Sequence, residues 1–116
     1  MEIEQHDILK QLDGVLQARR DADPSASYVA GLYAAGLNRI LEKVGEEATE
    51  VVLAAKDNAD GNASAALVGE VADLWFHSLV LLAQQELSSQ DVLGCLAERF
   101  GLSGIEEKAS RDRDAG

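Results

Sequence analysis

Aromatic residues and proline are scarce in this sequence. Phe, Trp and Tyr together make up 4% of the chain, and Pro24 is its one proline. Strands favour aromatic and β-branched side chains, so the shortage of aromatics argues against a sheet protein. Apolar residues are nevertheless 47% of the sequence, with Ala, Leu and Val prominent among them. This composition predicts an all-α fold.

Cysteine and positive charge are scarce as well. Cys95 is the single cysteine, so no disulfide can form within one chain, which suits a reducing compartment. The sequence has 10 Lys and Arg against 21 Asp and Glu, a formal net charge of −11. That charge argues against sequence-independent nucleic-acid binding, which depends on basic side chains at the phosphates. It also disfavours docking to anionic membranes.

Long apolar runs are missing too. The longest strictly apolar run, LVLLA at residues 79–83, is far too short to span a bilayer. The first residues, MEIEQHD, have neither the basic nor the apolar region of a signal peptide. We therefore expect a cytoplasmic protein, and a chain of 116 residues has room for one domain.

Apolar periodicity predicts four helical segments joined by short polar breaks. The first three cover about residues 4–22, 28–56 and 63–85, and the second is expected to kink or break near Gly36. Ser88 and Asp91 predict a capping box that starts the fourth helix, and Gly101 is expected to end it. The sequence thus predicts a four- to five-helix bundle over residues 1–105, followed by a charged, flexible tail over residues 106–116.

Two of these segments carry carboxylates beside their apolar stripe. At about 100° per residue, Glu47 borders the stripe of the second segment, and Glu50 lies one step further out. Glu46 falls near the opposite face. On the third segment Glu70 and Asp73 share one arc beside the stripe. If the two edges face each other, Glu47, Glu50, Glu70 and Asp73 converge.

Converging carboxylates predict a metal site, because they repel each other and are costly to desolvate without a counter-charge. All-oxygen ligands favour Mg²⁺, or Mn²⁺, over Zn²⁺. Mg²⁺ also keeps waters and accepts substrate phosphates, which suits pyrophosphate chemistry. A solvated helix face is the usual explanation for either acidic cluster alone. Their joint occurrence at the edges of neighbouring helices favours the metal site.

Several residues near the acidic edge leave alternatives open. Lys43 either binds a substrate phosphate or only offsets the glutamates, and Arg39, one turn earlier, is a second candidate for phosphate. His77, on the arc of Asp73, is expected either to hydrogen-bond a carboxylate or to pack. For Tyr28, core packing is favoured over stacking on a base, and Cys95 is expected in the core.

The two acidic blocks also carry a resemblance. KVGEEATEVVLAAKD, followed about twenty residues later by GEVADLWFHSLVLL, resembles the phosphoribosyl-ATP pyrophosphatase family, which acts in the second step of histidine biosynthesis. SYVAGLYAAGLNRILEKVGEE and SGIEEKASR match that family's pattern, so the similarity extends over about residues 8–111. The shorter motif EExxE…ExxD specifies only the wider superfamily of all-α, MazG-type nucleoside triphosphate pyrophosphohydrolases.

The resemblance implies an enzyme that hydrolyses the α–β phosphoanhydride of phosphoribosyl-ATP to phosphoribosyl-AMP and pyrophosphate. Glu47, Glu50, Glu70 and Asp73 are the expected metal ligands. Glu46 and Glu47 are the candidate catalytic residues, and Glu46 is expected to orient a ligand water or act as general base. No segment resembles the cyclohydrolase often fused to this family. The alternatives are a house-cleaning pyrophosphatase of the same superfamily and a non-catalytic helical module that binds a basic partner.

The third predicted helix bears on assembly, because it is apolar on nearly every side. Three other helices in so short a chain are too few to cover it. A second copy would bury the remaining face, so the sequence predicts a homodimer. The resemblance implies the same, since members of the superfamily assemble through these long helices.

Overall fold

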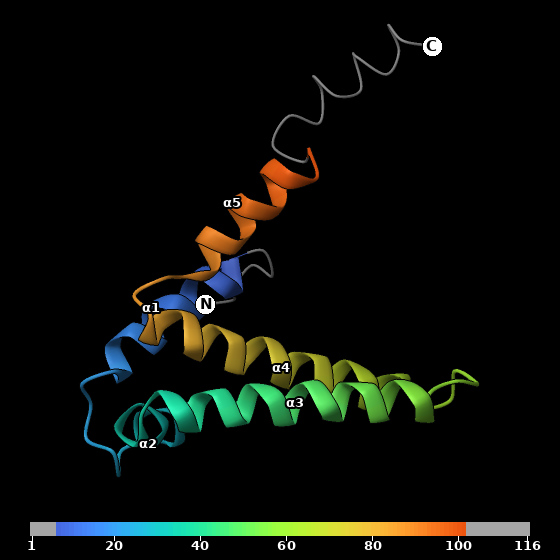
Figure 1. Cartoon of the computed structure of the whole chain (residues 1–116), viewed down its shortest axis with the longest axis horizontal. Coiled ribbons are helices and arrows are strands. Elements are labelled where there is room, and N and C mark those ends of the chain that lie inside the picture. The colour runs from blue at the N-terminus through green and yellow to red at the C-terminus, as the bar shows by residue number, and fades with distance from the viewer. Residues whose placement is uncertain (1–6, 102–116) are drawn as a thin grey trace, which may run out of the picture.

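The computed structural model describes residues 7–101, and within them it is all-α (Figure 1). The predicted tail over residues 106–116 lies outside the described residues. The helices, in chain order, are α1 (Ile8–Arg19), α2 (Tyr28–Ala35), α3 (Leu37–Asp57), α4 (Ser64–Gln84) and α5 (Ser89–Arg99). The expected all-α fold is confirmed.

The break predicted near Gly36 separates α2 from α3. Gly36 adopts φ 98°, a conformation that side-chain-bearing residues rarely reach. Its N–H still donates to the carbonyl of Leu32, which closes α2. Ser27 caps the start of α2, because its hydroxyl accepts from the Ala30 N–H at 3.1 Å. The second predicted segment is therefore two helices.

Helices α3 and α4 lie side by side and antiparallel (Figure 1). A short polar loop joins them, in which Gly61 adopts φ 82°. The side-chain oxygen of Asn58 accepts from the Ala63 N–H at 2.8 Å and ties the two ends of the loop together. This hairpin sets the acidic block of α3 beside that of α4.

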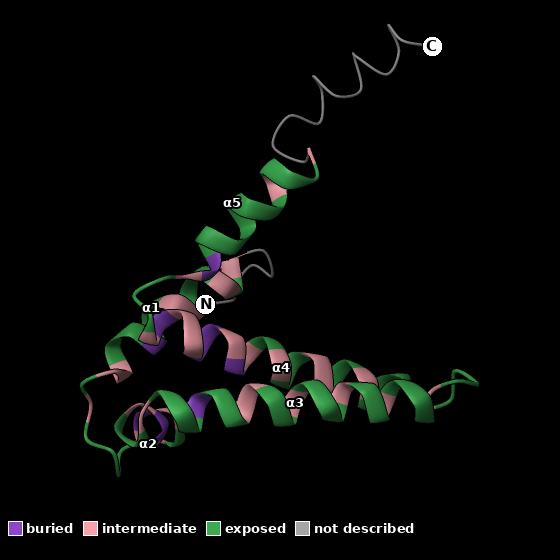
Figure 2. Ribbon diagram, in the orientation of Figure 1, coloured by how far each residue is buried: buried purple, intermediate pink, exposed green. Residues whose placement is uncertain are grey.

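The hydrophobic core lies at one end of the hairpin. Its buried members are Leu16, Leu32, Ile40, Leu79, Val80 and Ala83. Figure 2 shows that buried positions gather where α1 and α2 meet the near ends of α3 and α4, while the ribbon toward the α3–α4 loop is more exposed. The acidic residues therefore stand where the core ends.

Helix α4 is long and apolar enough, by length and composition, to cross a membrane. The central helix of a globular protein meets the same criteria. In this structure the C-terminal half of α4 supplies His77, Leu79, Val80 and Ala83 to the buried interior, and its N-terminal half carries Glu70 and Asp73. The C-terminal half of α4 therefore belongs to the core of this fold.

Helix α5 points away from the α3–α4 hairpin and packs against α1 (Figure 1). The predicted capping box at Ser88 and Asp91 is present, and Gly101 follows the helix at φ 71°. The expectation that Cys95 lies in the core is wrong for the single chain, since Cys95 is exposed. With so little of α5 packed against α4, most of its side chains remain open to solvent.

A buried polar contact attaches α5 to α1. The carboxylate of Asp13 accepts hydrogen bonds from both the backbone N–H of Ser89, at 2.9 Å, and its hydroxyl. Ser89 is 3% exposed, so the loss of Asp13 would leave two buried donors without a protein acceptor. Buried donors without partners are costly.

Asp13→Ala should therefore lower the free energy of unfolding by about 1–3 kcal/mol. Asp23→Ala is the matched control, because Asp23 also accepts from a serine N–H and hydroxyl, those of Ser25, but in an exposed local turn. Its effect should stay below about 0.5 kcal/mol. Urea denaturation at one fixed protein concentration measures both, and equal effects would contradict the role given to Asp13.

Candidate metal centre

Three carboxylates from two helices come together beside the core. Glu47 projects from α3 and Glu70 and Asp73 from α4, and one oxygen of each lies within 4.8 Å of the other two. Glu47 and Glu70 are half-buried and Asp73 is exposed. Octahedral Mg²⁺ with metal–oxygen distances of about 2.0–2.1 Å holds its ligand oxygens about 3–4 Å apart. Small side-chain rotations would therefore suffice for these three residues to share one ion.

The electrostatics of Glu70 reflect this crowding. Partial burial raises the pKa of Glu70 above its usual value, and repulsion from Glu50, Asp73 and Glu47 raises it further. Glu50, predicted as a fourth ligand, is exposed and stands outside the three-carboxylate group, although it is near enough to act on Glu70. The three other predicted ligands are the ones that the fold brings together.

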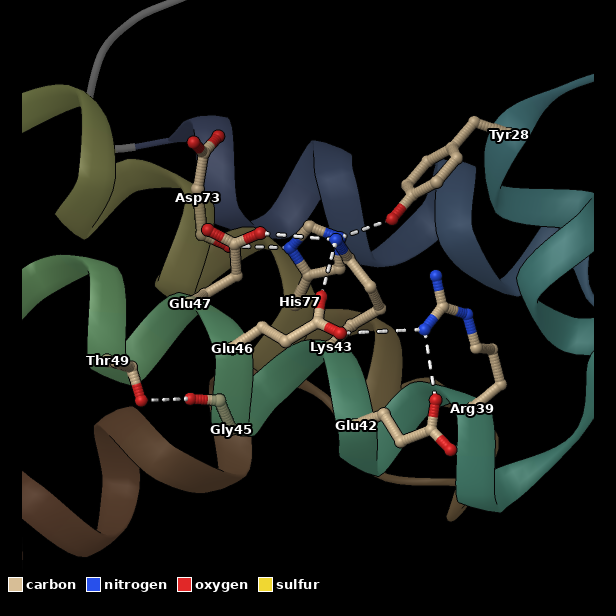
Figure 3. A network of polar contacts seen from close by, with 10 residues as sticks. All are labelled: Tyr28, Arg39, Glu42, Lys43, Gly45, Glu46, Glu47, Thr49, Asp73 and His77. Atoms are coloured by element: carbon tan, nitrogen blue, oxygen red, sulfur yellow. Dashed lines mark hydrogen bonds and ion pairs between the residues drawn. The ribbon is translucent and has the colours of Figure 1, made fainter.

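Lys43 is the basic residue that contacts this group. Its ammonium Nζ lies 3.2 Å from Glu46 Oε2 and 3.5 Å from Glu47 Oε1 (Figure 3). The hydrogen bond with Glu46 is the main cause of the raised pKa of Lys43. These contacts match the interpretation in which Lys43 offsets the glutamates, and its binding of a phosphate stays a prediction.

Glu46 and Arg39 are paired with each other rather than with the three-carboxylate group. Arg39 Nη1 lies 3.0 Å from Glu42 Oε2 and 3.7 Å from Glu46 Oε1 (Figure 3). Glu46 is thus held between Arg39 and Lys43 on the exposed side of α3. The wheel placed Glu46 away from the stripe, and the structure agrees that it is exposed.

His77 makes contacts that the sequence did not indicate. This buried ring has its Nδ1 2.8 Å from the backbone carbonyl of Asp73 and its Nε2 2.8 Å from the hydroxyl of Tyr28. A carbonyl only accepts, so Nδ1 carries the proton, and in the neutral ring Nε2 accepts from the tyrosine. His77 therefore does not bond to a carboxylate, and it does more than pack, because both of its ring nitrogens have hydrogen-bond partners. Tyr28 is 49 positions away, and no local pattern predicts such a pair.

The fold and this site define an all-α protein with a carboxylate centre of the kind that binds a divalent cation. The sequence model described as phosphoribosyl-ATP pyrophosphohydrolase matches residues 9–100. The chain belongs to that family. This bears out the resemblance seen in the acidic blocks.

Curated relatives extend the similarity over nearly the whole chain. A protein of Hydrogenovibrio crunogenus named phosphoribosyl-ATP pyrophosphatase is 58% identical over 109 residues, which are 94% of this chain and 96% of the relative. A protein of the same name from Burkholderia multivorans is 58% identical over 107 residues, 92% of this chain and 88% of the relative. The Burkholderia ambifaria protein, also 58% identical, has the same coverage.

Glu70→Gln should melt at a higher temperature than the wild type in the absence of metal. A raised carboxyl pKa means that ionisation of Glu70 disfavours the folded state, a cost that sets in as the pH rises past the ordinary value of 4.5 and is complete above the raised one. Glutamine removes that cost. The same variant should gain less from Mg²⁺ than the wild type, because it lacks a ligand.

Thermal melts at neutral pH, with and without Mg²⁺, measure both effects. Glu42→Gln is the control, because it removes an exposed carboxylate of α3 that pairs with Arg39 instead of the centre. An unchanged Mg²⁺ response in Glu70→Gln would contradict the site.

Proposed function

We propose that this chain hydrolyses the α–β phosphoanhydride of phosphoribosyl-ATP in the cytoplasm, releasing phosphoribosyl-AMP and pyrophosphate in the second step of histidine biosynthesis. The observation that carries the proposal is the three-carboxylate group on α3 and α4 in a chain of this family. The substrate is inferred from the names of the relatives, phosphoribosyl-ATP pyrophosphatase, which are similar over more than nine-tenths of the chain. The lone cysteine, Cys95, suits a reducing compartment.

We assign a divalent cation, Mg²⁺ or Mn²⁺, to Glu47, Glu70 and Asp73, with Glu50 as the fourth ligand. The donor set fits, because carboxylate oxygens are the ligands these ions prefer. When bound, the cation offsets phosphate charge and acidifies a coordinated water. A cation held by these carboxylates would thus attract a polyphosphate that the chain's net charge would otherwise repel.

Residues beside the centre complete the proposed mechanism. Glu46, held by Lys43 and Arg39, orients the attacking water or accepts its proton, and Glu47 shares this catalytic role from within the metal group. Lys43 and Arg39 use their remaining N–H donors to bind substrate phosphates.

Purified protein with Mg²⁺ should turn over phosphoribosyl-ATP far faster than ATP, dATP or dUTP, with pyrophosphate as product. Asp73→Asn should lower kcat/KM by at least about 100-fold, the order seen when charge stabilisation in an active site is removed. Comparable rates on the common nucleotides would favour a house-cleaning pyrophosphatase. No turnover of any nucleotide, with or without Mg²⁺, would favour a non-catalytic module.

We also propose that the active form is a homodimer. Large apolar side chains of both long helices are more than half exposed in the single chain: Val52, Leu53, Val68 and Trp75. Within residues 7–101 no other helix of the same chain covers them. A second copy that packs on these faces would bury them in a symmetric interface. The homodimer therefore accounts for a core that occupies one end of the hairpin.

Light scattering at micromolar concentration should give about twice the chain mass of 12.4 kDa. Val68→Glu should shift the protein toward monomer, because the valine is 67% exposed on α4 and a carboxylate buried in an apolar interface is costly. A fully active wild-type monomer would refute the assembly.

A further inference from the structure

Tyr28 stands beside His77 in an unusual orientation (Figure 3). A tyrosine commonly buries its ring and leaves its hydroxyl in water. Here the hydroxyl donates to the buried His77 at 2.8 Å, while the residue is 55% exposed. Core packing, the interpretation favoured from the sequence, is therefore wrong for the single chain. The polar end is held inside and the apolar ring faces outward.

The ring of Tyr28 is both fixed and open. The centroids of the Tyr28 and His77 rings lie 5.8 Å apart and their planes meet at 82°. Because the tyrosine approaches His77 through its hydroxyl tip (Figure 3), the histidine covers neither face of the ring. Ser27 caps the helix turn that carries Tyr28. Part of the ring surface is therefore accessible to a planar ligand, since the residue is 55% exposed.

His77 links this ring to the metal centre. It is 6% exposed, and its Nδ1 donates to the backbone carbonyl of Asp73 at 2.8 Å. A single buried side chain thus fixes the position of Tyr28 relative to the α4 backbone at Asp73, the residue that carries one of the three carboxylates. Figure 3 shows Tyr28 beside His77, and it also draws Lys43 and Arg39, the two basic residues that contact the glutamates of α3.

The other aromatic residues in the described part of the chain serve different ends. Tyr33 donates its hydroxyl to the carbonyl of Val80 at 3.2 Å and packs on the core. Phe76 also packs on the core. Trp75 is exposed but lines a groove with α1 and α5, and Phe100 lies beyond the end of α5. Tyr28 is the exposed ring tied to the metal centre.

We propose that Tyr28 is a specificity-determining residue that seats a purine base of the substrate by stacking, and that His77 is the positioning residue that fixes its ring. The inference rests on the proposed function, in which the polyphosphate of a nucleotide lies at the carboxylates. Every base has a π-face that an aromatic side chain can bind. The site then recognises its substrate at two points, the phosphates at the centre and the base at Tyr28.

Steady-state kinetics with phosphoribosyl-ATP test the inference. Tyr28→Leu keeps side-chain bulk but removes the aromatic ring, and should raise KM by about 5- to 150-fold, the range of base–aromatic stacking, with little change in kcat. Tyr28→Phe keeps the ring but loses its anchor, and should raise KM less. Tyr33→Phe is the matched control, since it removes a hydroxyl that joins α2 to α4 away from the site, and its KM should equal that of the wild type.

Two further measurements separate base contact from a structural disturbance. Inhibition by pyrophosphate, which has no base, should be as strong in Tyr28→Leu as in the wild type. His77→Leu should raise KM as Tyr28→Phe does, and His77→Gln, whose amide oxygen can accept from the tyrosine, should recover part of the loss.

The results that would overturn the role of Tyr28 differ from the result that would overturn the proposed function. A wild type that turns over phosphoribosyl-ATP while Tyr28→Leu keeps its KM would overturn the inference alone. Two other results would also overturn it. If pyrophosphate inhibition of Tyr28→Leu weakens by the same factor as its KM rises, Tyr28 has a structural role. If Tyr28→Leu dissociates into monomers in light scattering, Tyr28 has an interface role. A wild type inactive on every nucleotide would remove the proposed function itself.

Discussion

Repulsion among the carboxylates at the joined edges of α3 and α4 is the constraint around which this structure is built. Packing the two helices side by side brings Glu47, Glu70 and Asp73 together, and the raised pKa of Glu70 records the cost. Like charges in a partly buried site disfavour the folded state unless a cation compensates them. Lys43 compensates only part, because it reaches Glu46 and Glu47 on its own helix. A divalent cation would offset the remainder, so the fold and the proposed chemistry depend on the same group.

The surrounding structure holds that repulsive edge in place. Apolar packing of Leu16, Ile40 and Val80 at the near end of the hairpin fixes α3 against α4 without using the acidic residues. Helix α2 adds two tyrosine hydroxyls bonded to α4, those of Tyr28 and Tyr33. Burial raises the pKa of Tyr33 to about 12, so its hydroxyl remains protonated and a donor at physiological pH. The three-carboxylate group therefore lies at the border of the packed core.

Much of this could be predicted from the sequence, for physical reasons that act locally. Helical periodicity located the long helices. Gly36 marked the break because glycine readily adopts the positive φ that the structure has there. The capping box at Ser88 depends on residues three positions apart. The wheel placed Glu47, Glu70 and Asp73 at the stripe edges, and helix geometry alone then brings them together once α3 and α4 pair. Local rules determine the helices, their caps and the helix faces, while the meeting of the carboxylates also needs the pairing of α3 with α4, which leaves the predicted Glu50 outside the group.

Contacts between distant residues escaped prediction. The Tyr28–His77 pair and the Asp13–Ser89 pair join positions 49 and 76 residues apart, and neither follows from periodicity or capping. The exposure of Cys95 and Tyr28 was missed because an apolar or aromatic residue at helical spacing looks the same whether its own chain covers it or not. The direction in which α5 leaves the hairpin decides the exposure of Cys95, and no local pattern specifies that direction.

The central claim is that Glu47, Glu70 and Asp73 bind one divalent cation together, and Mn²⁺ titration followed by electron paramagnetic resonance tests it most directly. The wild type should bind Mn²⁺, and Mg²⁺ should compete for the same site. Glu47→Gln, Glu70→Gln and Asp73→Asn should each weaken binding by at least about 10-fold, the factor that corresponds to about 1.4 kcal/mol. Glu42→Gln should bind as the wild type does. Equal Mn²⁺ affinity in all five proteins would contradict the account.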